Sequence, residues 1–174
     1  MAKIIGKAYI GIDTGTHTGV AVWGGGQFLL LETMAIHKAM KIVNEYVQSG
    51  IDVVVRVEDP RQRTWFGTER MSREQERKKL QGVGSVKRDA SIWDDYLSDL
   101  CKDKANIKYE MVAPKRNVTK LTGESFKAIT KWQGRTNEHN RDAAMLVFGL
   151  YVKFCLNMCL LNTKLVSLQR VFTK

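Results

Sequence analysis

The sequence predicts an α/β fold in which one five-stranded mixed sheet carries helices on both faces. Three observations predict it. Near the N-terminus, three short β-rich segments follow one another with only glycine-rich or threonine-rich breaks between them. Further along, segments with helical periodicity alternate with strand patterns. Residues 51–58 form an almost continuous apolar run, which is typical of a parallel strand covered on both faces.

The first three strands are expected at residues 8–13, 20–23 and 27–33, as a meander. A helix should follow, because apolar residues recur at helical spacing from Ile36 to Val47. Gly50 marks the place where this helix ends. The chain then enters the strand at 51–58.

The second half of the sequence predicts three helices and one more strand. Nine basic and three acidic residues lie between Arg61 and Arg88, which indicates a basic loop with a helical middle. Ser85 is the expected cap of a helix that ends near Cys101. A fifth strand is expected at 107–112, a short helix around 125–130, and a last, long helix that begins near Asn137; these are listed in chain order.

The resulting order, βββ-α-β-α-β-α-α, implies a sheet that is antiparallel at first and parallel later. A chain of 174 residues with 44% hydrophobic content suits one domain with a single core. We therefore treat residues 1–174 as one domain, with its core at about 7–160 and a tail at 161–174 to which no role is assigned.

Charge and cysteine content narrow the setting in which the protein works. Lysine and arginine outnumber aspartate and glutamate by 28 to 18, a formal net charge of +10 that favours a polyanionic partner such as nucleic acid. The three cysteines form no C-x-x-C pair and are odd in number, which argues against a disulfide framework. The N-terminus lacks the pattern of a signal peptide. We expect a protein of the cytoplasm.

Residues 143–161 are largely apolar and have about the length of a membrane span. Lys153 and Asn157 interrupt this segment, and Arg141 and Asp142 stand at its head. Polar residues in the middle of the segment favour a buried helix over a transmembrane one. No membrane partner is expected.

Two acidic residues stand at strand ends. Asp13 closes the first strand within the segment Ile10–Thr16, and Glu58 closes the strand at 51–58. Neighbouring parallel strands would bring the two carboxylates together, where they repel each other unless a hard cation such as Mg²⁺ is bound. Each acid taken alone also fits an ordinary turn or loop residue.

A third group of polar residues heads the last helix. Glu138, His139 and Asp142 are three or four residues apart and can share a face across one helical turn. Acids at a helix N-terminus also complement the helix dipole whatever the function, so this group alone does not establish a site. Together, however, the three acidic positions would converge at one edge of the predicted sheet.

These segments resemble the RuvC-like Holliday-junction resolvases of the RNase H-like superfamily, especially the compact forms of phages and prophages. The resemblance covers about residues 7–150 and is carried by four segments: 11–13, 57–61, 82–88 and 136–144. It implies an RNase H-like fold and a metal site formed by Asp13, Glu58, His139 and Asp142. Glu138 competes with His139 for the fourth place.

The resemblance further implies Mg²⁺-dependent hydrolysis of phosphodiester bonds with two metal ions, with Mn²⁺ as a substitute for Mg²⁺. Resolving a four-way DNA junction takes two symmetric nicks, so a homodimer is implied. Its candidate interfaces are the helix that begins at Ser85 and the apolar C-terminal segment. Eight residues are expected to contact DNA, by phosphate contacts or base stacking: Arg61, Arg63, Trp65, Phe66, Lys87, Arg88, Lys115 and Arg116.

Three other interpretations stay open. A less selective RNase H-like nuclease would act on flaps or hybrids, and a DNA-binding module would keep the fold without cleavage. Residues 13–19 also match the D-x-G-T-x-x-G phosphate loop of sugar kinases and actin-like ATPases. Those proteins clamp a nucleotide between two lobes, whereas this chain is long enough for one, so the kinase-like interpretation is disfavoured.

Overall fold

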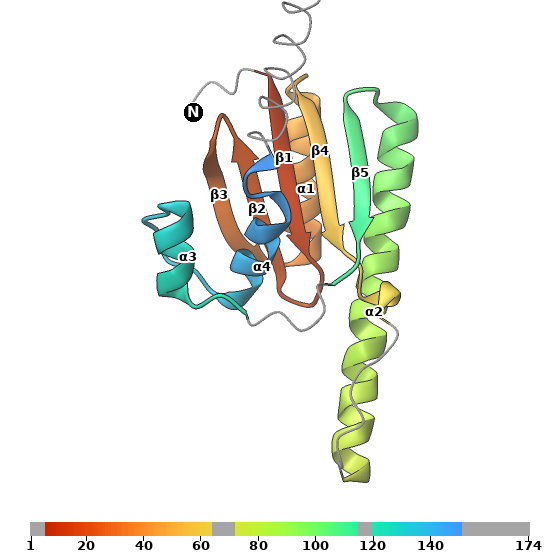
Figure 1. Cartoon of the computed structure of the whole chain (residues 1–174). Helices are drawn as coiled ribbons and strands as arrows, with labels where there is room; N and C mark the ends of the chain where they lie inside the picture. The colour runs from red at the N-terminus through yellow and green to blue at the C-terminus, as the bar shows by residue number, and fades with distance from the viewer. Residues whose placement is uncertain (1–5, 64–71, 115–119, 151–174) are drawn as a thin grey trace, which may run out of the picture.

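A computed structural model of the chain describes residues 6–63, 72–114 and 120–150, and shows an α/β fold built on one open five-stranded sheet (Figure 1). The strands are β1 (Lys7–Asp13), β2 (Thr18–Gly24), β3 (Gln27–Met34), β4 (Asp52–Glu58) and β5 (Ile107–Val112). Their order across the sheet is β3-β2-β1-β4-β5. The β1–β2 and β2–β3 pairs are antiparallel, and the β1–β4 and β4–β5 pairs are parallel. The predicted mixed sheet is thus confirmed.

Helices cover both faces of this sheet, as the sequence predicts. They are α1 (Ile36–Gln48), the short 3-10 helix η1 (Pro60–Gln62), α2 (Arg73–Asp103), α3 (Gly123–Thr130) and α4 (Glu138–Val147). Side chains of α1 and α2 pack on one face, and side chains of α3 and α4 pack on the other. Because successive residues of a strand point to opposite faces, each strand supplies both layers.

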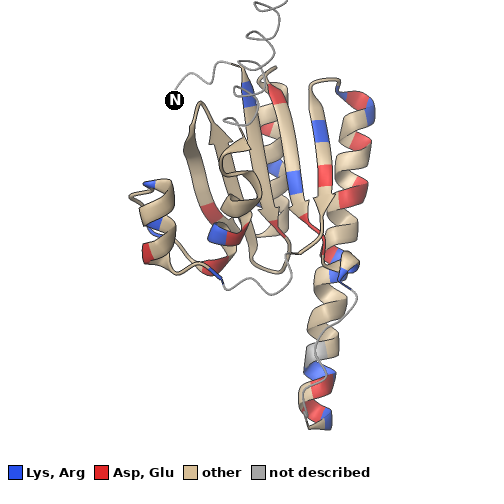
Figure 2. Cartoon of the chain, in the orientation of Figure 1, with Lys and Arg blue, Asp and Glu red and all other residues tan. Residues whose placement is uncertain are grey.

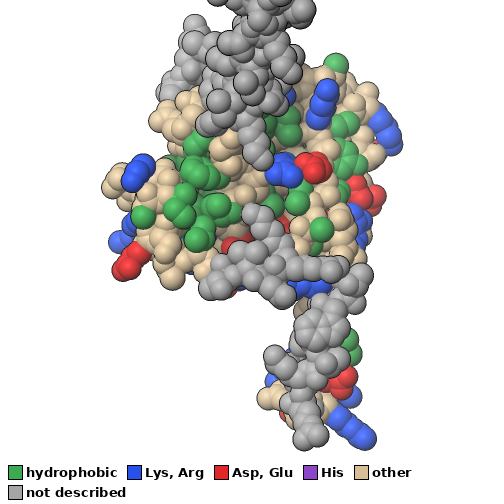
Figure 3. Space-filling view, in the orientation of Figure 1, with side chains coloured by type: hydrophobic (Ala, Val, Ile, Leu, Met, Phe, Trp, Pro, Cys, Tyr) green, Lys and Arg blue, Asp and Glu red, His purple; other side chains and the backbone are tan. Residues whose placement is uncertain are grey.

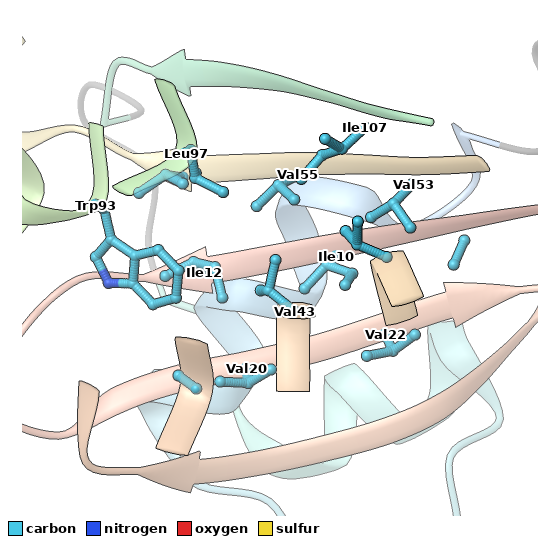
Figure 4. Packing of buried hydrophobic residues seen from close by; sticks show 14 residues of the cluster. Ile10, Ile12, Val20, Val22, Val43, Val53, Val55, Trp93, Leu97 and Ile107 are labelled. Carbon is cyan, nitrogen blue, oxygen red and sulfur yellow. The ribbon is translucent and has the colours of Figure 1, made fainter. Parts of the chain in front are cut away.

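The face under α1 and α2 holds an aliphatic core (Figure 4). Ile10 of β1 and Val55 of β4 are fully buried there, together with Val43 of α1 and Trp93 of α2. Full burial of such a side chain contributes about 1.5–3 kcal/mol. This layer fixes β1 and β4 side by side.

The opposite face has a more aromatic core, formed by Trp23, Phe28 and Phe126 with small residues of α4. The ring centroids of Trp23 and Phe28 lie 4.7 Å apart in an edge-to-face arrangement, which suits the quadrupoles of the two rings. Figure 3 shows hydrophobic side chains gathered on this side of the molecule. The face therefore holds α4 at short range against the sheet.

The predicted start of α2 at Ser85 is wrong. The helix begins at Arg73 and is capped by Ser72, thirteen residues before the predicted cap, and it runs for 31 residues through Gly82 and Gly84. Ser72 accepts a hydrogen bond from the Gln75 amide (3.3 Å), and the Gln75 side chain accepts one from the Ser72 amide (3.0 Å). This capping box stabilises the helix start. A helical glycine costs only about 1 kcal/mol relative to alanine, so two glycines need not end a helix held at both ends.

The start of the last helix is confirmed, but its predicted length is not. Asn137 is the N-cap of α4, and the helix ends at Val147 after ten residues. Gly149 follows with a φ of +76°, a left-handed conformation that glycine adopts at helix ends. Within the described ranges no helix is long and apolar enough to span a membrane. The rest of the apolar segment to residue 161 lies outside the described residues.

Candidate active site

Asp13 and Glu58 lie side by side at the C-terminal ends of β1 and β4, which are neighbouring inner strands of the sheet. In the parallel pairing of β1 with β4, Ile12 is opposite Val57, so the next residue of each strand stands at the same level. The alternation of side chains places both carboxylates on the face that carries α4. The Thr14 hydroxyl donates a hydrogen bond to the Glu58 carbonyl oxygen (3.1 Å), which ties the two strand ends together. Figure 2 shows the acidic ends of β1 and β4 beside the head of α4.

Two glycines allow the backbone of α4 to lie in direct contact with the sheet near these strand ends. A Cβ atom on Gly19 would collide with the carbonyl oxygen of His139, and one on Gly11 would collide with that of Ala143. Since Asp13 pairs with Gly19 across β1 and β2, the first turn of α4 lies directly over the end of β1. Any side chain at Gly19 would displace the helix and the polar residues at its head.

The N-terminus of α4 is anchored in the same region. Asn137 and Asn140 form a reciprocal capping box, each side chain accepting from the amide of the other residue at 3.0 Å. The Thr33 hydroxyl of β3 donates to the Asn137 side chain (2.9 Å). At the other end of the helix, the Arg56 guanidinium donates to the Leu146 carbonyl oxygen (2.8 Å). These contacts fix the position and the direction of α4 on the sheet.

The anchored helix brings His139 and Asp142 to the acidic strand ends. His139 Nδ1 lies 3.0 Å from Asp13 Oδ2. Asp142 Oδ2 lies 2.9 Å from the Nζ atom of Lys120, which also contacts Glu138 at 3.3 Å. Asp13, Glu58, His139 and Asp142 thus gather from three elements, as the sequence predicts.

The charges of this cluster are not balanced. Burial, and then the charges of Asp13 and Asp142, raise the pKa of Glu58 from 4.5 to about 7. Burial also raises the pKa of Asp13, although its hydrogen bond with His139 acts in the opposite direction. Within the described part of the chain, the Glu58 carboxylate has no hydrogen bond or ion pair. The cluster therefore carries an excess of negative charge that a cation would relieve.

The donor set fits a divalent cation such as Mg²⁺, because carboxylate oxygens are the ligands that this ion prefers. The side chains do not yet form a cage. Among the described residues, no three acidic, imidazole or thiol groups converge as a ready metal site. Asp142 instead contacts Lys120, and Asp13 contacts His139. A cation bound to Asp142 would displace Lys120 from that carboxylate.

The expected DNA contacts have different surroundings. Arg61, expected to bind phosphate, is held by the carboxylates of Asp59 and Asp94 at 2.7 and 2.9 Å. Arg63 is exposed and close enough to Glu58 to lower its pKa. On α2, Lys87 is half-buried and Arg88 is exposed. Four expected contacts lie outside the described residues: Trp65, Phe66, Lys115 and Arg116.

Two residues near the acids are absent from the sequence prediction. Lys120 is one of several cations in a basic stretch, and nothing in its spacing links it to Asp142. His17 lies in the turn after Asp13, and its ring centroid is 6.3 Å from that of His139. Its place four residues after Asp13 is a signal that could have identified it.

No protein-family model matches this chain, and neither does any curated protein.

Proposed function

We propose that this protein is a Mg²⁺-dependent endonuclease with an RNase H-like fold, related to the RuvC-like resolvases, that cleaves four-way or other branched DNA. One observation carries the proposal: Asp13, Glu58 and Asp142 stand at the ends of β1 and β4 and on the first turns of α4, and burial together with the charges of the other two acids raises the pKa of Glu58 to about 7. Perturbed carboxylates gathered at one point are characteristic of functional sites. A merely structural role would leave Glu58 paired, whereas its carboxylate has no hydrogen bond or ion pair within the described part of the chain.

In this proposal, Asp13, Glu58 and Asp142 hold the metal, and His139 takes the fourth place. His139 rather than Glu138 is favoured because its imidazole contacts Asp13 at 3.0 Å, whereas Glu138 faces Lys120 at the exposed rim. When bound, the metal ions would activate a water molecule and stabilise the leaving oxygen. The Asp13 carboxylate holds the His139 ring in one orientation, which prepares its other nitrogen to accept or donate a proton.

The charge of the chain supports a nucleic-acid substrate. The net charge of +10 favours phosphate binding, and Arg63 stands beside the acidic cluster, where a phosphate would otherwise be repelled. Lys87 and Arg88 of α2 are further candidates for phosphate contacts. Paired nicks in a four-way junction would need a homodimer, with α2 as a candidate interface.

The test is cleavage of a labelled four-way junction beside linear duplex, flap and RNA–DNA hybrid, with Mg²⁺ or a chelator. Wild type should make paired nicks in the branched substrate only with Mg²⁺, and Asp13→Asn should make none. Asp52→Asn, which changes an exposed aspartate on β4, is the matched control and should cleave normally. Equal cleavage of flaps or hybrids would favour the less selective nuclease, and binding without cleavage would favour a DNA-binding module.

A further inference from the structure

A network of charged side chains occupies the corner that follows Glu58. Asp59 is 3% exposed, and its Oδ1 atom accepts hydrogen bonds from the amide (3.0 Å) and the Nε atom (2.7 Å) of Arg61. The Nη2 atom of Arg61 donates to both Asp59 Oδ2 and Asp94 Oδ2, at 2.9 Å each. The Tyr109 hydroxyl donates to the other oxygen of Asp94 (2.9 Å). We call these four residues the corner network.

The charges of the corner network make Arg61 a poor phosphate ligand. Two carboxylates surround one guanidinium, so the group carries a net charge of about −1 and would repel a phosphate. Nη1, the nitrogen atom that contacts neither carboxylate, makes a long contact of 3.4 Å with the Ser91 hydroxyl. A bidentate pair of this kind fixes geometry. The side-chain contacts of Arg61 therefore lie within the protein.

The network fixes the backbone that follows Glu58. The Asp59 amide donates to the Val112 carbonyl oxygen (2.7 Å), which extends the pairing of β4 with β5 one residue beyond Glu58. Arg61 then ties Asp59 to α2 through Asp94, and Tyr109 ties Asp94 back to β5. The Glu58 carboxylate has no partner of its own among the described residues, so its place depends on this backbone.

We propose that the corner network positions the Glu58 carboxylate for metal binding, and that Arg61 acts as a positioning residue rather than as a DNA contact. This inference rests on the proposed function. Groups that orient a metal ligand typically change metal affinity or activity by roughly 10- to 100-fold when they are altered. Disturbing the network should lower kcat and weaken cation binding, and should leave DNA affinity unchanged.

Two variants test this without touching the acidic cluster. Asp94→Asn and Tyr109→Phe each remove one link and keep the shape of the side chain. Asp99→Asn on the same helix and Tyr96→Phe are matched controls, since Asp99 pairs with Lys102 at the surface and Tyr96 donates to Met40. The measurements are kcat and KM on a four-way junction with Mg²⁺, Mn²⁺ affinity by calorimetry without DNA, and DNA affinity by fluorescence anisotropy in chelator.

We expect both variants to lower kcat by roughly 10-fold or more and to weaken Mn²⁺ binding, with KM and DNA affinity as in the controls. Unchanged kcat and Mn²⁺ affinity would overturn the proposal. So would a lower melting temperature accompanied by normal kcat for each folded molecule, because that combination shows a purely structural role.

Arg61→Lys separates positioning from phosphate contact. Lysine keeps the positive charge but cannot form the two-pronged contact with Asp59. The positioning role predicts the same loss of kcat as Asp94→Asn. Normal kcat with a raised KM would instead identify a phosphate contact and overturn the proposal. If wild type cleaves none of the substrates, the proposed function fails, and the Mn²⁺ affinities of the variants alone decide whether the network positions Glu58.

Discussion

Glu58 and Asp59 are neighbours in the chain, yet their surroundings treat their charges in opposite ways. The pKa of Glu58 is raised to about 7 by burial and by the charges of Asp13 and Asp142. The pKa of Asp59 is lowered: burial alone would raise it, but the hydrogen bonds from Arg61 outweigh that effect. The Glu58 carboxylate has no hydrogen bond or ion pair among the described residues, whereas the Asp59 carboxylate is held by the Arg61 guanidinium. Of these two adjacent residues, Glu58 therefore has the surroundings of a cation ligand, and Asp59 has those of a structural ion pair.

The largest expected effect comes from removing the uncompensated charge. Glu58→Gln keeps the shape of the side chain and takes away a metal ligand, so Mg²⁺-dependent cleavage should fall by more than roughly 100-fold, beyond the usual loss from a group that only orients a ligand. Glu32→Gln changes an exposed glutamate of β3 and should cleave normally. Initial rates on the junction substrate measure both. Activity in Glu58→Gln close to wild type would remove Glu58 from the site.

A substitution of Asp59 should lower the stability of the fold. Asp59→Asn leaves the Arg61 guanidinium with one carboxylate instead of two, and losing one charged partner in this half-buried group costs about 1–3 kcal/mol. For a chain of this size, each kcal/mol lowers the melting temperature by about 2–4 °C. Thermal unfolding followed by circular dichroism should therefore show a clear drop. A melting temperature equal to that of wild type would show that Asp59 is not needed for the corner.

The pH dependence of stability should differ in sign between the two acids. Glu58 has a higher pKa folded than unfolded, so its contribution favours folding at low pH and is lost as pH rises from 4.5 through about 7. In chelator, Glu58→Gln should therefore gain in melting temperature over wild type at pH 8 but not at pH 4. A gain that is the same at both pH values would contradict the raised pKa.

For Asp59 the sign reverses, because its folded pKa lies below the ordinary value of 3.8. Its stabilising contribution is present above the unfolded pKa and is lost as pH falls through the folded pKa. The stability lost in Asp59→Asn should thus be constant between pH 5 and pH 8. It should shrink only in strong acid, which the same melting series extended to low pH would detect.

The smallest expected effect concerns Lys120, which partly compensates the acidic cluster through Asp142. A cation that enters the site must displace it. Lys120→Met should therefore tighten Mn²⁺ binding by about two- to five-fold, the range expected for an exposed ion pair. Lys127→Met on α3 is the matched control. Weaker Mn²⁺ binding in Lys120→Met, measured by calorimetry, would show that Lys120 supports the metal instead of competing with it.

Several features of this protein follow from sequence alone. Alternation and apolar runs identify all five strands, because a strand half-buried or fully buried in a sheet requires those patterns. The adjacency of Asp13 and Glu58 follows from the end positions of neighbouring parallel strands. Asn137 is recognisable as a helix start because a side-chain cap acts over three residues. Each of these features depends on local contacts or on the period of the chain.

Other features were decided only by the tertiary structure. One partner of Arg61 is Asp94, 33 residues further along the chain, and one partner of Lys120 is Asp142, 22 residues away. The distance between α4 and the sheet depends on the absence of a side chain at Gly19. Contacts between segments far apart in the sequence determine which acidic side chains have a basic partner. No local sequence pattern encodes those contacts.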